Sequence, residues 1–522
     1  MPSGNSFIQN LRRKPSVDPN KSALRKAGAE HARKNVDRMF RKSSFVRDSK
    51  KISMLEDLDL PQFELHELKL GKVLGKGRFA TVKEIRGFHV QVDPTTSPKS
   101  SSSSGGGGGS GFFKHRGVNP RDNDQKKKNH DDNVVEEEEV DFESRKFIAK
   151  HCLRNGGDAR YMVKFLSPEV IEEPAIYMQG LQDLAMETRF LHHLQHTNIV
   201  KLRAVSLHPF TESFFLVMDR LYDSLEKRFA KWQNQQQQQQ QQQQNQQNNN
   251  KSRMSFPKRL TGGGGGGDNN NNNTNNNDDD ANNNANKDEF LAERLLAAYD
   301  LSDALVYLHG KNIVYRDLKP ENIGFDVRDD IKIFDFGLSK EITPDMEKYK
   351  DDTYRLTGMT GKVLYMAPEV GLDQPYNFKC DVYGLSILLW EMVTLQKAYS
   401  RGNSPQQQQT ITTSMIREHV WENGKRPDTT GLSSRALRLL FARGWTSDLK
   451  SRHSMKSFSD CLRKELVRAR GDDKDESGLD HEKRRSTFVF RNKHGGGGGR
   501  SLGRGSSREL TKTTSKEEEK DS

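Results

Sequence analysis

Hydrophobic and polar residues alternate along short stretches of this chain, and a period of two predicts strands. In residues 68–82, LKLGKVLGKGRFATV, the alternation breaks at Gly75 and Gly77 and resumes before Val82. This pattern predicts two strands joined by a glycine turn, whose backbone amides can approach an anion such as a phosphate. Taken alone, it is equally typical of an ordinary hairpin. A buried strand running into a polar segment is predicted over residues 214–221, FFLVMDRL.

Two other segments have apolar residues at helical spacing. The first contains Leu181, Leu184, Phe190, Leu191 and Leu194. The second contains Phe290, Leu291, Leu295, Ala298, Leu301, Leu305 and Leu308, and Gly310 is expected to end it.

Directly after the second helix, residues 315–337 read YRDLKPENIGFDVRDDIKIFDFG, in which two apolar runs flank a charged turn. The pattern predicts a hairpin that brings Asn322 close to Asp335. An amide oxygen and a carboxylate are ligands that Mg²⁺ accepts, usually with substrate phosphates in the same coordination shell. We therefore expect a phosphate-binding site here.

Composition restricts these elements to one folded domain. Only 32% of the 522 residues are hydrophobic, and long stretches are homopolymeric. We predict a disordered basic arm over residues 1–60, low-complexity insertions at about 91–139 and 234–287, and a disordered tail over residues 471–522.

The charge balance is positive, with 84 Lys and Arg against 72 Asp and Glu, a net charge of +12. Because the charges are mixed along flexible segments, we do not expect a nucleic-acid partner. The three cysteines lack the spacing of a metal site or a disulfide framework. The most apolar run, residues 382–393, is too short to span a bilayer and contains Glu391. We expect an intracellular protein of the cytoplasm, with the nucleus as the second location, and no membrane span.

Residues 315–322, YRDLKPEN, and 335–337, DFG, resemble the catalytic loop and the metal-binding loop of eukaryotic protein kinases. The two motifs together, at this spacing, are highly specific. The resemblance implies that Asp317 accepts the proton of a substrate hydroxyl, that Asn322 and Asp335 hold Mg²⁺, and that ATP is the phosphoryl donor.

The type of kinase follows from neighbouring residues. Lys319, two residues after the catalytic aspartate, is the form associated with serine/threonine kinases, in which it contacts the γ-phosphate. Tyr315 replaces the usual histidine of the family. The sequence of residues 357–370, TGMTGKVLYMAPEV, is most similar to that of the tyrosine-kinase-like branch of serine/threonine kinases.

The resemblance covers about residues 63–470 and implies an α+β, two-lobed protein kinase fold. A small, mainly β N-terminal lobe and a larger α-helical C-terminal lobe would hold Mg-ATP between them. By position in the family pattern, the ATP contacts would come from the glycine loop and the hinge, at Gly75, Gly77, Val82, Asp219 and Leu221.

The same pattern requires a lysine that pairs with the ATP phosphates, and two candidates exist, Lys150 and Lys164. Lys164 has apolar neighbours on both sides and lies at the usual separation from Glu187, its expected acidic partner on the first helix. We choose Lys164 and keep Lys150 as the alternative.

Beyond DFG, an activation segment is expected, with Thr353, Thr357 and Thr360 as candidate regulatory phosphorylation sites near Arg316. Within it, Lys362 stands where serine/threonine kinases usually carry a threonine. That lysine could form an ion pair with Asp317.

Two further pairings follow from the family pattern. Glu369 resembles the glutamate that pairs with a distant arginine, for which Arg452 is in place. Asp381 is expected to accept hydrogen bonds from the catalytic-loop backbone.

The sequence therefore favours an ATP-dependent serine/threonine protein kinase that acts on protein substrates with Mg²⁺. The alternative is a pseudokinase scaffold, which binds nucleotide or partners without phosphotransfer.

Overall fold

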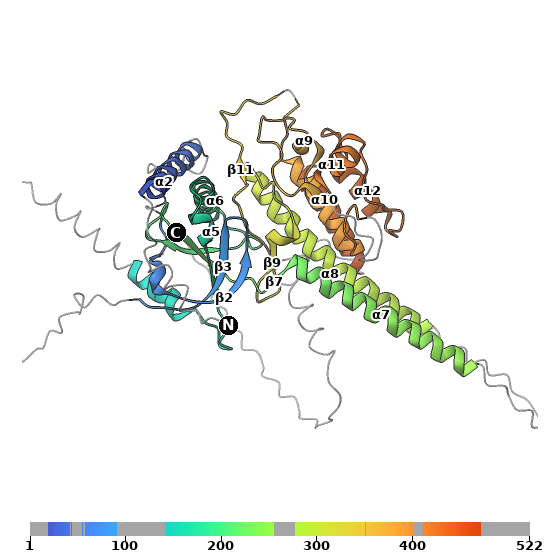
Figure 1. Cartoon of the computed structure of the whole chain (residues 1–522). Helices are drawn as coiled ribbons and strands as arrows, with labels where there is room; N and C mark the ends of the chain where they lie inside the picture. The colour runs from blue at the N-terminus through green and yellow to red at the C-terminus, as the bar shows by residue number, and fades with distance from the viewer. Residues whose placement is uncertain are drawn as a thin grey trace, which may run out of the picture. The chain divides into compact units, whose positions relative to one another are not determined.

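The computed structural model describes residues 19–41, 43, 55, 58–90, 141–254, 277–349, 351–400 and 411–470. A sheet-rich N-terminal lobe is followed by a helical C-terminal lobe (Figure 1), so the predicted α+β two-lobed architecture is confirmed. None of the helices in these described ranges is both long and apolar enough to cross a membrane.

The N-terminal lobe is built on a six-stranded sheet with the order β1-β5-β6-β4-β3-β2, antiparallel except for the parallel pair β1 and β5. The predicted pair of strands around the glycine turn is present as β2 and β3. The strands are β1 (Gln62–Phe63), β2 (Leu68–Lys76), β3 (Ala80–Phe88), β4 (Tyr161–Leu166), β5 (Leu202–Ser206) and β6 (Phe215–Asp219).

Both faces of this sheet are covered. On one face lie the short α5 (Pro168–Ile171) and the long α6 (Pro174–His193), whose apolar residues join the main core of the molecule. On the other face, residues 141–150 form a helix that contributes Ile148 to a second core. The helix predicted around residues 181–194 is therefore present and begins earlier, at a proline that suits a first helical turn.

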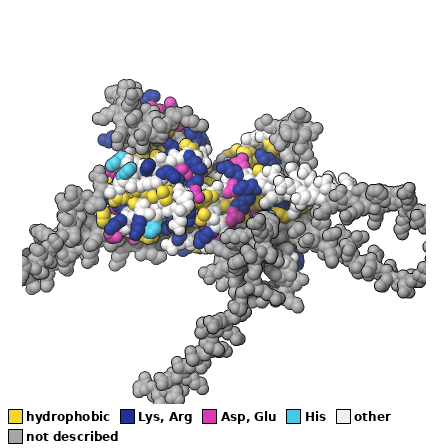
Figure 2. Space-filling model, turned by 90° about the horizontal axis from the view of Figure 1, so that it is seen from below, with side chains coloured by type: hydrophobic (Ala, Val, Ile, Leu, Met, Phe, Trp, Pro, Cys, Tyr) yellow, Lys and Arg dark blue, Asp and Glu magenta, His cyan; other side chains and the backbone are white. Residues whose placement is uncertain are grey.

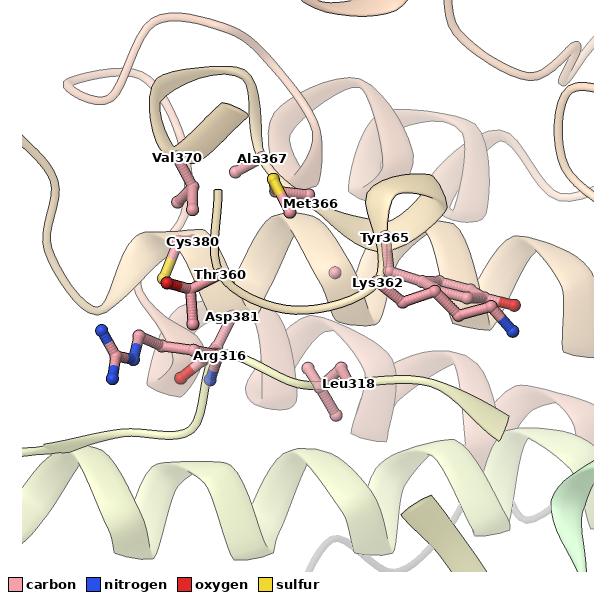
Figure 3. A pocket seen from close by; sticks show the side chains of 11 residues that line it. Arg316, Leu318, Thr360, Lys362, Tyr365, Met366, Ala367, Val370, Cys380 and Asp381 are labelled. Atoms are coloured by element: carbon pink, nitrogen blue, oxygen red, sulfur yellow. The ribbon is translucent and has the colours of Figure 1, made fainter. Parts of the chain in front are cut away.

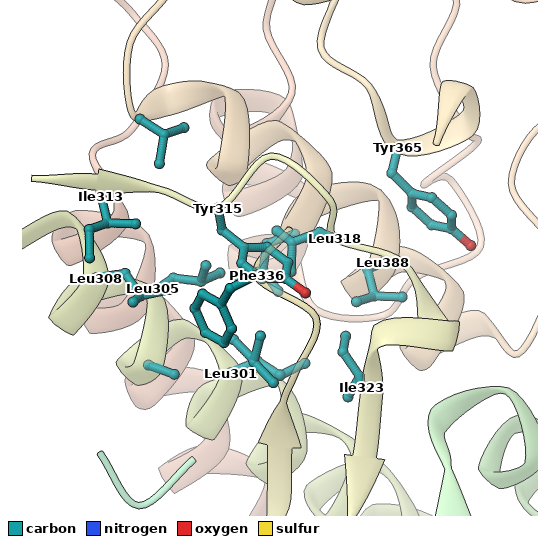
Figure 4. Packing of buried hydrophobic residues seen from close by; sticks show 14 of the residues in the cluster. Leu301, Leu305, Leu308, Ile313, Tyr315, Leu318, Ile323, Phe336, Tyr365 and Leu388 are labelled. Atoms are coloured by element: carbon teal, nitrogen blue, oxygen red, sulfur yellow. The ribbon is translucent and has the colours of Figure 1, made fainter. Parts of the chain in front are cut away.

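The C-terminal lobe is organised around α8 and α10, and α10 is buried along nearly its whole length because most of its residues are apolar and its buried polar side chains are hydrogen-bonded. Figure 4 shows residues of α8 packing against the catalytic-loop side chains of Tyr315 and Leu318. The helices are α7 (Leu225–Met254), α8 (Asn277–Gly310), α9 (Pro368–Gly371), α10 (Lys379–Thr394), α11 (Thr413–Ile416), α12 (Arg435–Gly444) and α13 (Met455–Arg470), with a π-helix at Arg417–Glu422.

Two small sheets lie at the junction of the lobes. One has the order β10-β9-β7, and the other pairs β11 with β8. Their strands are β7 (Asp223–Ser224), β8 (Ile313–Val314), β9 (Ile323–Phe325), β10 (Ile331–Ile333) and β11 (Lys340–Glu341). The antiparallel pair β9 and β10 is the hairpin predicted from the apolar runs on either side of the charged turn.

The prediction of a disordered arm over residues 1–60 is wrong for residues 19–41. Helix α2 (Pro19–Phe40) packs on α6, with Ala32, Val36 and Phe40 buried at a spacing of four residues. Arg33, Lys34 and Arg38 stand between these buried residues, so the segment reads as basic and polar and the period was missed. Residues 1–18 lie outside the described part.

The prediction of a disordered insertion at about 234–287 is likewise wrong at both of its ends. Helix α7 continues to Met254, and α8 begins at Asn277. The first turns of α7 are anchored, since Trp232 is buried and donates to Glu293 at 3.0 Å. Once a helix is nucleated, each further glutamine extends it at little cost, because glutamine is a good helix former. Residues 255–276, and the predicted insertion at 91–139 and tail at 471–522, lie outside the described residues.

Candidate active site

Asp317 lies at the centre of the site, buried in the loop between β8 and β9. Its Oδ2 accepts hydrogen bonds from Lys319 Nζ at 2.5 Å and from Asn322 Nδ2 at 2.7 Å. Asn322 Nδ2 also donates to the Asp317 carbonyl at 3.1 Å, which closes the loop on itself. The other carboxylate oxygen, Oδ1, has no hydrogen-bond partner among the described residues. One oxygen is thus held in place while the second can accept a proton.

The loop is tied to the core by Asp381, near the start of α10. Its carboxylate accepts the backbone amides of Tyr315 at 2.9 Å and of Arg316 at 2.8 Å, and also bonds His309 at 2.9 Å. Arg316 has a φ of 67°, a left-handed conformation that a non-glycine residue adopts only when its surroundings enforce it. The expected hydrogen bonds from the loop backbone to Asp381 are therefore present and supply that constraint.

Lys164 connects the two lobes. From β4 its Nζ lies 2.5 Å from Glu187 Oε2 on α6 and 3.0 Å from Asp335 Oδ1, 171 residues further along the chain. Lys150 instead ends the helix over residues 141–150 and is exposed. The geometry selects Lys164 and sets aside the alternative.

The electrostatic interactions among Lys164, Glu187 and Asp335 shift the pKa values of all three groups. Burial would raise the pKa of Asp335, but the Lys164 ammonium outweighs that effect and the pKa is lowered. Burial opposes the charged form of Lys164 too, yet the carboxylates of Asp335 and Glu187 raise the pKa of the ammonium. Burial raises the pKa of Glu187, and Lys164 partly offsets this. The site thus carries a charged lysine and a charged Asp335.

Asn322 and Asp335 are brought together by the hairpin. Ile323 on β9 pairs with Ile333 on β10, and the Phe334 amide donates to the Asn322 carbonyl at 3.1 Å. An amide oxygen and an ionised carboxylate are hard oxygen donors of the type that Mg²⁺ takes. In the described part of the chain no group of three or more His, Cys, Asp or Glu side chains could hold a metal ion by itself. These two residues therefore fit Mg²⁺ that is shared with substrate phosphates.

Asp183, which sequence reasoning missed, faces the same site. Asp183 lies one helical turn before Glu187. A Cβ added to Gly337 would lie 3.3 Å from the Cβ of Asp183. Burial, followed by repulsion from Asp335, raises the pKa of Asp183 to about 7. Its spacing of four residues from Glu187 was the available sequence signal, since residues i and i+4 share one face of a helix.

The comparisons with known proteins agree with this geometry. Residues 276–464 match the family model described as protein kinase domain. The chain contains a protein kinase domain. The match begins directly before α8 and ends in α13, so it covers most of the C-terminal lobe, and the sheet with Lys164 and α6 with Glu187 complete the two-lobed kinase fold.

Several relatives carry kinase names. The chain is 39% identical over 151 residues to the dual specificity protein kinase shkB of Dictyostelium discoideum, covering 29% of this chain and 21% of the relative. It is 31% identical over 189 residues to the serine/threonine-protein kinase STY17 of Arabidopsis thaliana, covering 36% and 30%. It is 40% identical over 116 residues to the serine/threonine-protein kinase CTR1 of Arabidopsis thaliana, covering 22% and 13%. In each case the matched segment spans less than a third of the relative's length.

In this kinase domain the glycine loop is the tight turn between β2 and β3. The Gly77 amide donates to the Ala80 carbonyl at 2.8 Å and closes the turn, whereas a Cβ at Gly75 would meet no atom within 4 Å. Val82 on β3 is directly opposite Lys164 in the sheet register. Of the three predicted ATP contacts from this loop, Val82 lies next to the lysine, Gly75 is opposite Val82 on β2, and Gly77 lies in the turn.

The hinge follows β6. The Asp219 carboxylate binds Arg203 through two hydrogen bonds, at 2.8 and 2.7 Å, so this side chain joins the inner strands β5 and β6. The side chain of Leu221 packs onto Gly324 of β9 so closely that a Cβ on that glycine would lie 2.8 Å from Leu221 Cδ1. The backbone of Leu221 has no hydrogen-bond partner within the described residues, as a nucleotide-binding hinge requires.

Lys362 does not pair with Asp317, so that expectation is wrong. Its ammonium binds the Glu321 carboxylate, which lowers the pKa of Glu321 despite partial burial. Figure 3 shows the Lys362 side chain running beside Tyr365, whose ring centroid lies 5.9 Å from Nζ. The cation that pairs with Asp317 is Lys319, whose Nζ lies 2.5 Å from Oδ2.

The three candidate threonines differ in access. Thr353 is buried and donates to Asp351 at 2.7 Å, and Thr360 donates to the carbonyls of Thr357 and Gly358. Thr357 is exposed, and its carbonyl accepts the Tyr376 hydroxyl at 2.7 Å.

Proposed function

We propose that this protein is a serine/threonine protein kinase that transfers the γ-phosphate of ATP, with Mg²⁺, to hydroxyl groups of protein substrates. The observation that carries the proposal is the contact of Lys164 with both Glu187 and Asp335. This contact joins the nucleotide side of the site to the metal side, and catalysis of phosphoryl transfer depends mainly on such positioning and charge neutralisation.

The residues divide the work as follows. Lys164, held by Glu187, would bind the ATP phosphates, and Lys319 would stabilise the charge on the transferred group. Asp317 Oδ1, the carboxylate oxygen without a partner, would accept the proton of the substrate hydroxyl. Bound Mg²⁺, held by Asn322 and Asp335, would neutralise negative charge on the phosphates.

The surface that is visible from below fits a protein rather than a polyanion as the partner. In Figure 2, lysine and arginine side chains lie interspersed with acidic and hydrophobic side chains on that face. Mixed charge of this kind favours protein contacts over the neutralisation of a phosphate backbone.

Regulation would act through the activation segment. Arg316 donates to the Tyr376 hydroxyl at 3.2 Å, and that hydroxyl donates to the Thr357 carbonyl. Burial, together with the nearby Arg316 guanidinium, lowers the pKa of Lys340. Two cations close together suit a phosphate, so Thr357 is our first choice among the candidate threonines.

The proposal is tested with radiolabelled Mg-ATP and a general protein substrate. Wild-type protein should transfer label, and Asp317→Asn should reduce transfer by at least a hundredfold because the base is lost. The matched control is Asp460→Asn on α13, which removes an exposed carboxylate far from the motifs and should leave transfer unchanged. Equal transfer by wild type and Asp317→Asn would sink the proposal. Magnesium-dependent ATP binding without any transfer would instead identify a pseudokinase scaffold.

A further inference from the structure

Helix α2 lies along α6, the helix that carries Glu187 (Figure 1). Ala32 and Val36 have no exposed surface and Phe40 has only 3%, and the three repeat every four residues on one face. One turn before Ala32, a Cβ added to Gly28 would lie 3.3 Å from Met178 Cβ, so the two helices approach closely at that point. The contact is therefore a packed helix interface.

Polar contacts near both ends of α2 attach it to the N-terminal lobe. Near the C-terminal end, Arg189 of α6 binds Asp37 at 3.0 Å and lies over the Phe40 ring at 4.9 Å. At the other end, Arg25 binds Glu212 at 3.1 Å and donates to the Ile171 carbonyl at 3.4 Å. Because Arg189 is 3% exposed, the Asp37 carboxylate supplies compensating charge to a buried cation.

A series of aromatic contacts leads from α2 to the catalytic loop. The Phe40 ring meets Phe190 of α6 edge-on at 5.7 Å, Phe190 meets Phe336 at 6.4 Å, and Phe336 meets Tyr315 edge-on at 5.4 Å. Phe336 follows the metal-binding Asp335, and Figure 4 shows it against Tyr315. Phe40 and Phe190 also line a cavity of about 170 Å³ together with Met346, beyond β11.

We propose that α2 is a built-in positioning element that holds α6 where Glu187 reaches Lys164, with Asp37 and Arg189 as its positioning residues. Glu187 is only two residues from Arg189, so a shift of α6 that breaks the Asp37 contact also moves Glu187. The docked helix shifts the population toward the conformation with the Lys164–Glu187 pair formed. The inference rests on the proposed kinase function for its effect on activity, but not for its effect on α6.

The test uses the full chain and three variants. Asp37→Arg places two cations against each other, Asp37→Glu keeps the negative charge, and Glu30→Arg reverses an exposed charge on the solvent side of the same helix. We expect Asp37→Arg to raise the KM for ATP about tenfold, a usual size for coupling between sites. The KM values for ATP of Asp37→Glu and Glu30→Arg should stay within about twofold of the wild-type value. An unchanged KM in Asp37→Arg would overturn the proposal.

A binding cycle separates positioning from a general loss of structure. In a Lys164→Ala background, adding Asp37→Arg should cause no further loss of Mg-ATP affinity, because the residue that Glu187 positions is absent. The same loss in both backgrounds would overturn the proposal.

Hydrogen exchange provides a readout that does not depend on catalysis. Amides of α6 should exchange faster in Asp37→Arg than in Glu30→Arg, while those of α10 stay unchanged. Equally faster exchange in both helices would mean a general stability role and would overturn the proposal. If wild-type protein transfers no phosphate, the kinase proposal fails, and faster exchange confined to α6 still supports the role of α2.

Discussion

Arg452 donates two hydrogen bonds to the carboxylate of Glu369, at 2.6 Å from Nη1 and 3.0 Å from Nη2, across 83 residues of sequence. Arg452 is 1% exposed and Glu369 5% exposed. The guanidinium also donates to the Lys379 carbonyl at the start of α10 at 3.1 Å. The pair therefore joins α9 to the helix that anchors the catalytic loop, as the sequence predicted.

Breaking this pair should be strongly destabilising. Glu369→Gln should lower the free energy of unfolding by about 3 kcal/mol, because a buried guanidinium loses its compensating charge. Urea unfolding of the full chain measures the change. Asp460→Asn breaks an exposed pair with Lys456 and should cost less than about 0.5 kcal/mol. Similar losses of unfolding free energy in Glu369→Gln and Asp460→Asn would contradict a special role for the buried Glu369–Arg452 pair.

The Lys362–Glu321 pair should behave in the opposite way. Its side chains are 38% and 39% exposed, so Lys362→Thr should change the free energy of unfolding by less than about 1 kcal/mol. Because Lys362 does not contact Asp317, we expect phosphoryl transfer to stay within about tenfold of wild type, whereas Asp317→Asn loses far more. Transfer assays with both variants decide this, and equal losses would show that Lys362 acts on the base.

Gly324 should not tolerate a side chain. A Cβ there would lie 2.8 Å from Leu221 Cδ1 and 3.0 Å from the Asp223 carbonyl. We expect Gly324→Ala to destabilise the domain by about 1 to 3 kcal/mol through overpacking, and to weaken ATP binding because the hinge must move. Thermal unfolding and ATP titration measure the two effects. The control Gly431→Ala meets no atom within 4 Å and should change neither property.

Asp223 should make stability depend on acid pH. Burial would raise its pKa, but hydrogen bonds from Lys231 and Arg228 outweigh this and lower the pKa below the ordinary value of 3.8. Its contribution is therefore present above the unfolded value and is lost as the pH falls through the lower folded value. Between pH 7 and pH 3, wild type should lose more stability in urea unfolding than Asp223→Asn does. Equal losses of stability in wild type and Asp223→Asn would show that protonation of Asp223 does not affect folding.

Thr357 should be the threonine whose phosphorylation matters. Thr357→Ala should lower the activity of protein that has been incubated with Mg-ATP, whereas Thr353→Ala should change mainly stability because Thr353 is 1% exposed. Arg316→Gln should remove the dependence on Thr357, since the phosphate would lose its cation. Mass spectrometry of the incubated protein identifies the modified residue, and modification at Thr360 alone would contradict the choice of Thr357.

Local sequence determined much of this protein. The hairpin of β9 and β10, the glycine turn between β2 and β3, and the apolar face of α6 each follow from periodicity within one short segment. The motifs at Asp317 and Asp335 carry their chemistry in adjacent residues, so the amino-acid sequence alone is enough to recognise them. Such features need no knowledge of distant contacts.

Tertiary structure decided the remaining questions, because each depends on which side chains meet across long stretches of chain. Lys164 rather than Lys150 reaches Glu187 because β4 faces α6, and Lys362 binds Glu321 while Lys319 pairs with Asp317. The basic N-terminal arm contains a helix whose buried face, ending at Phe40, packs against α6. A segment of mainly polar residues gains order when a partner surface buries its few apolar side chains, and no local pattern reveals that partner.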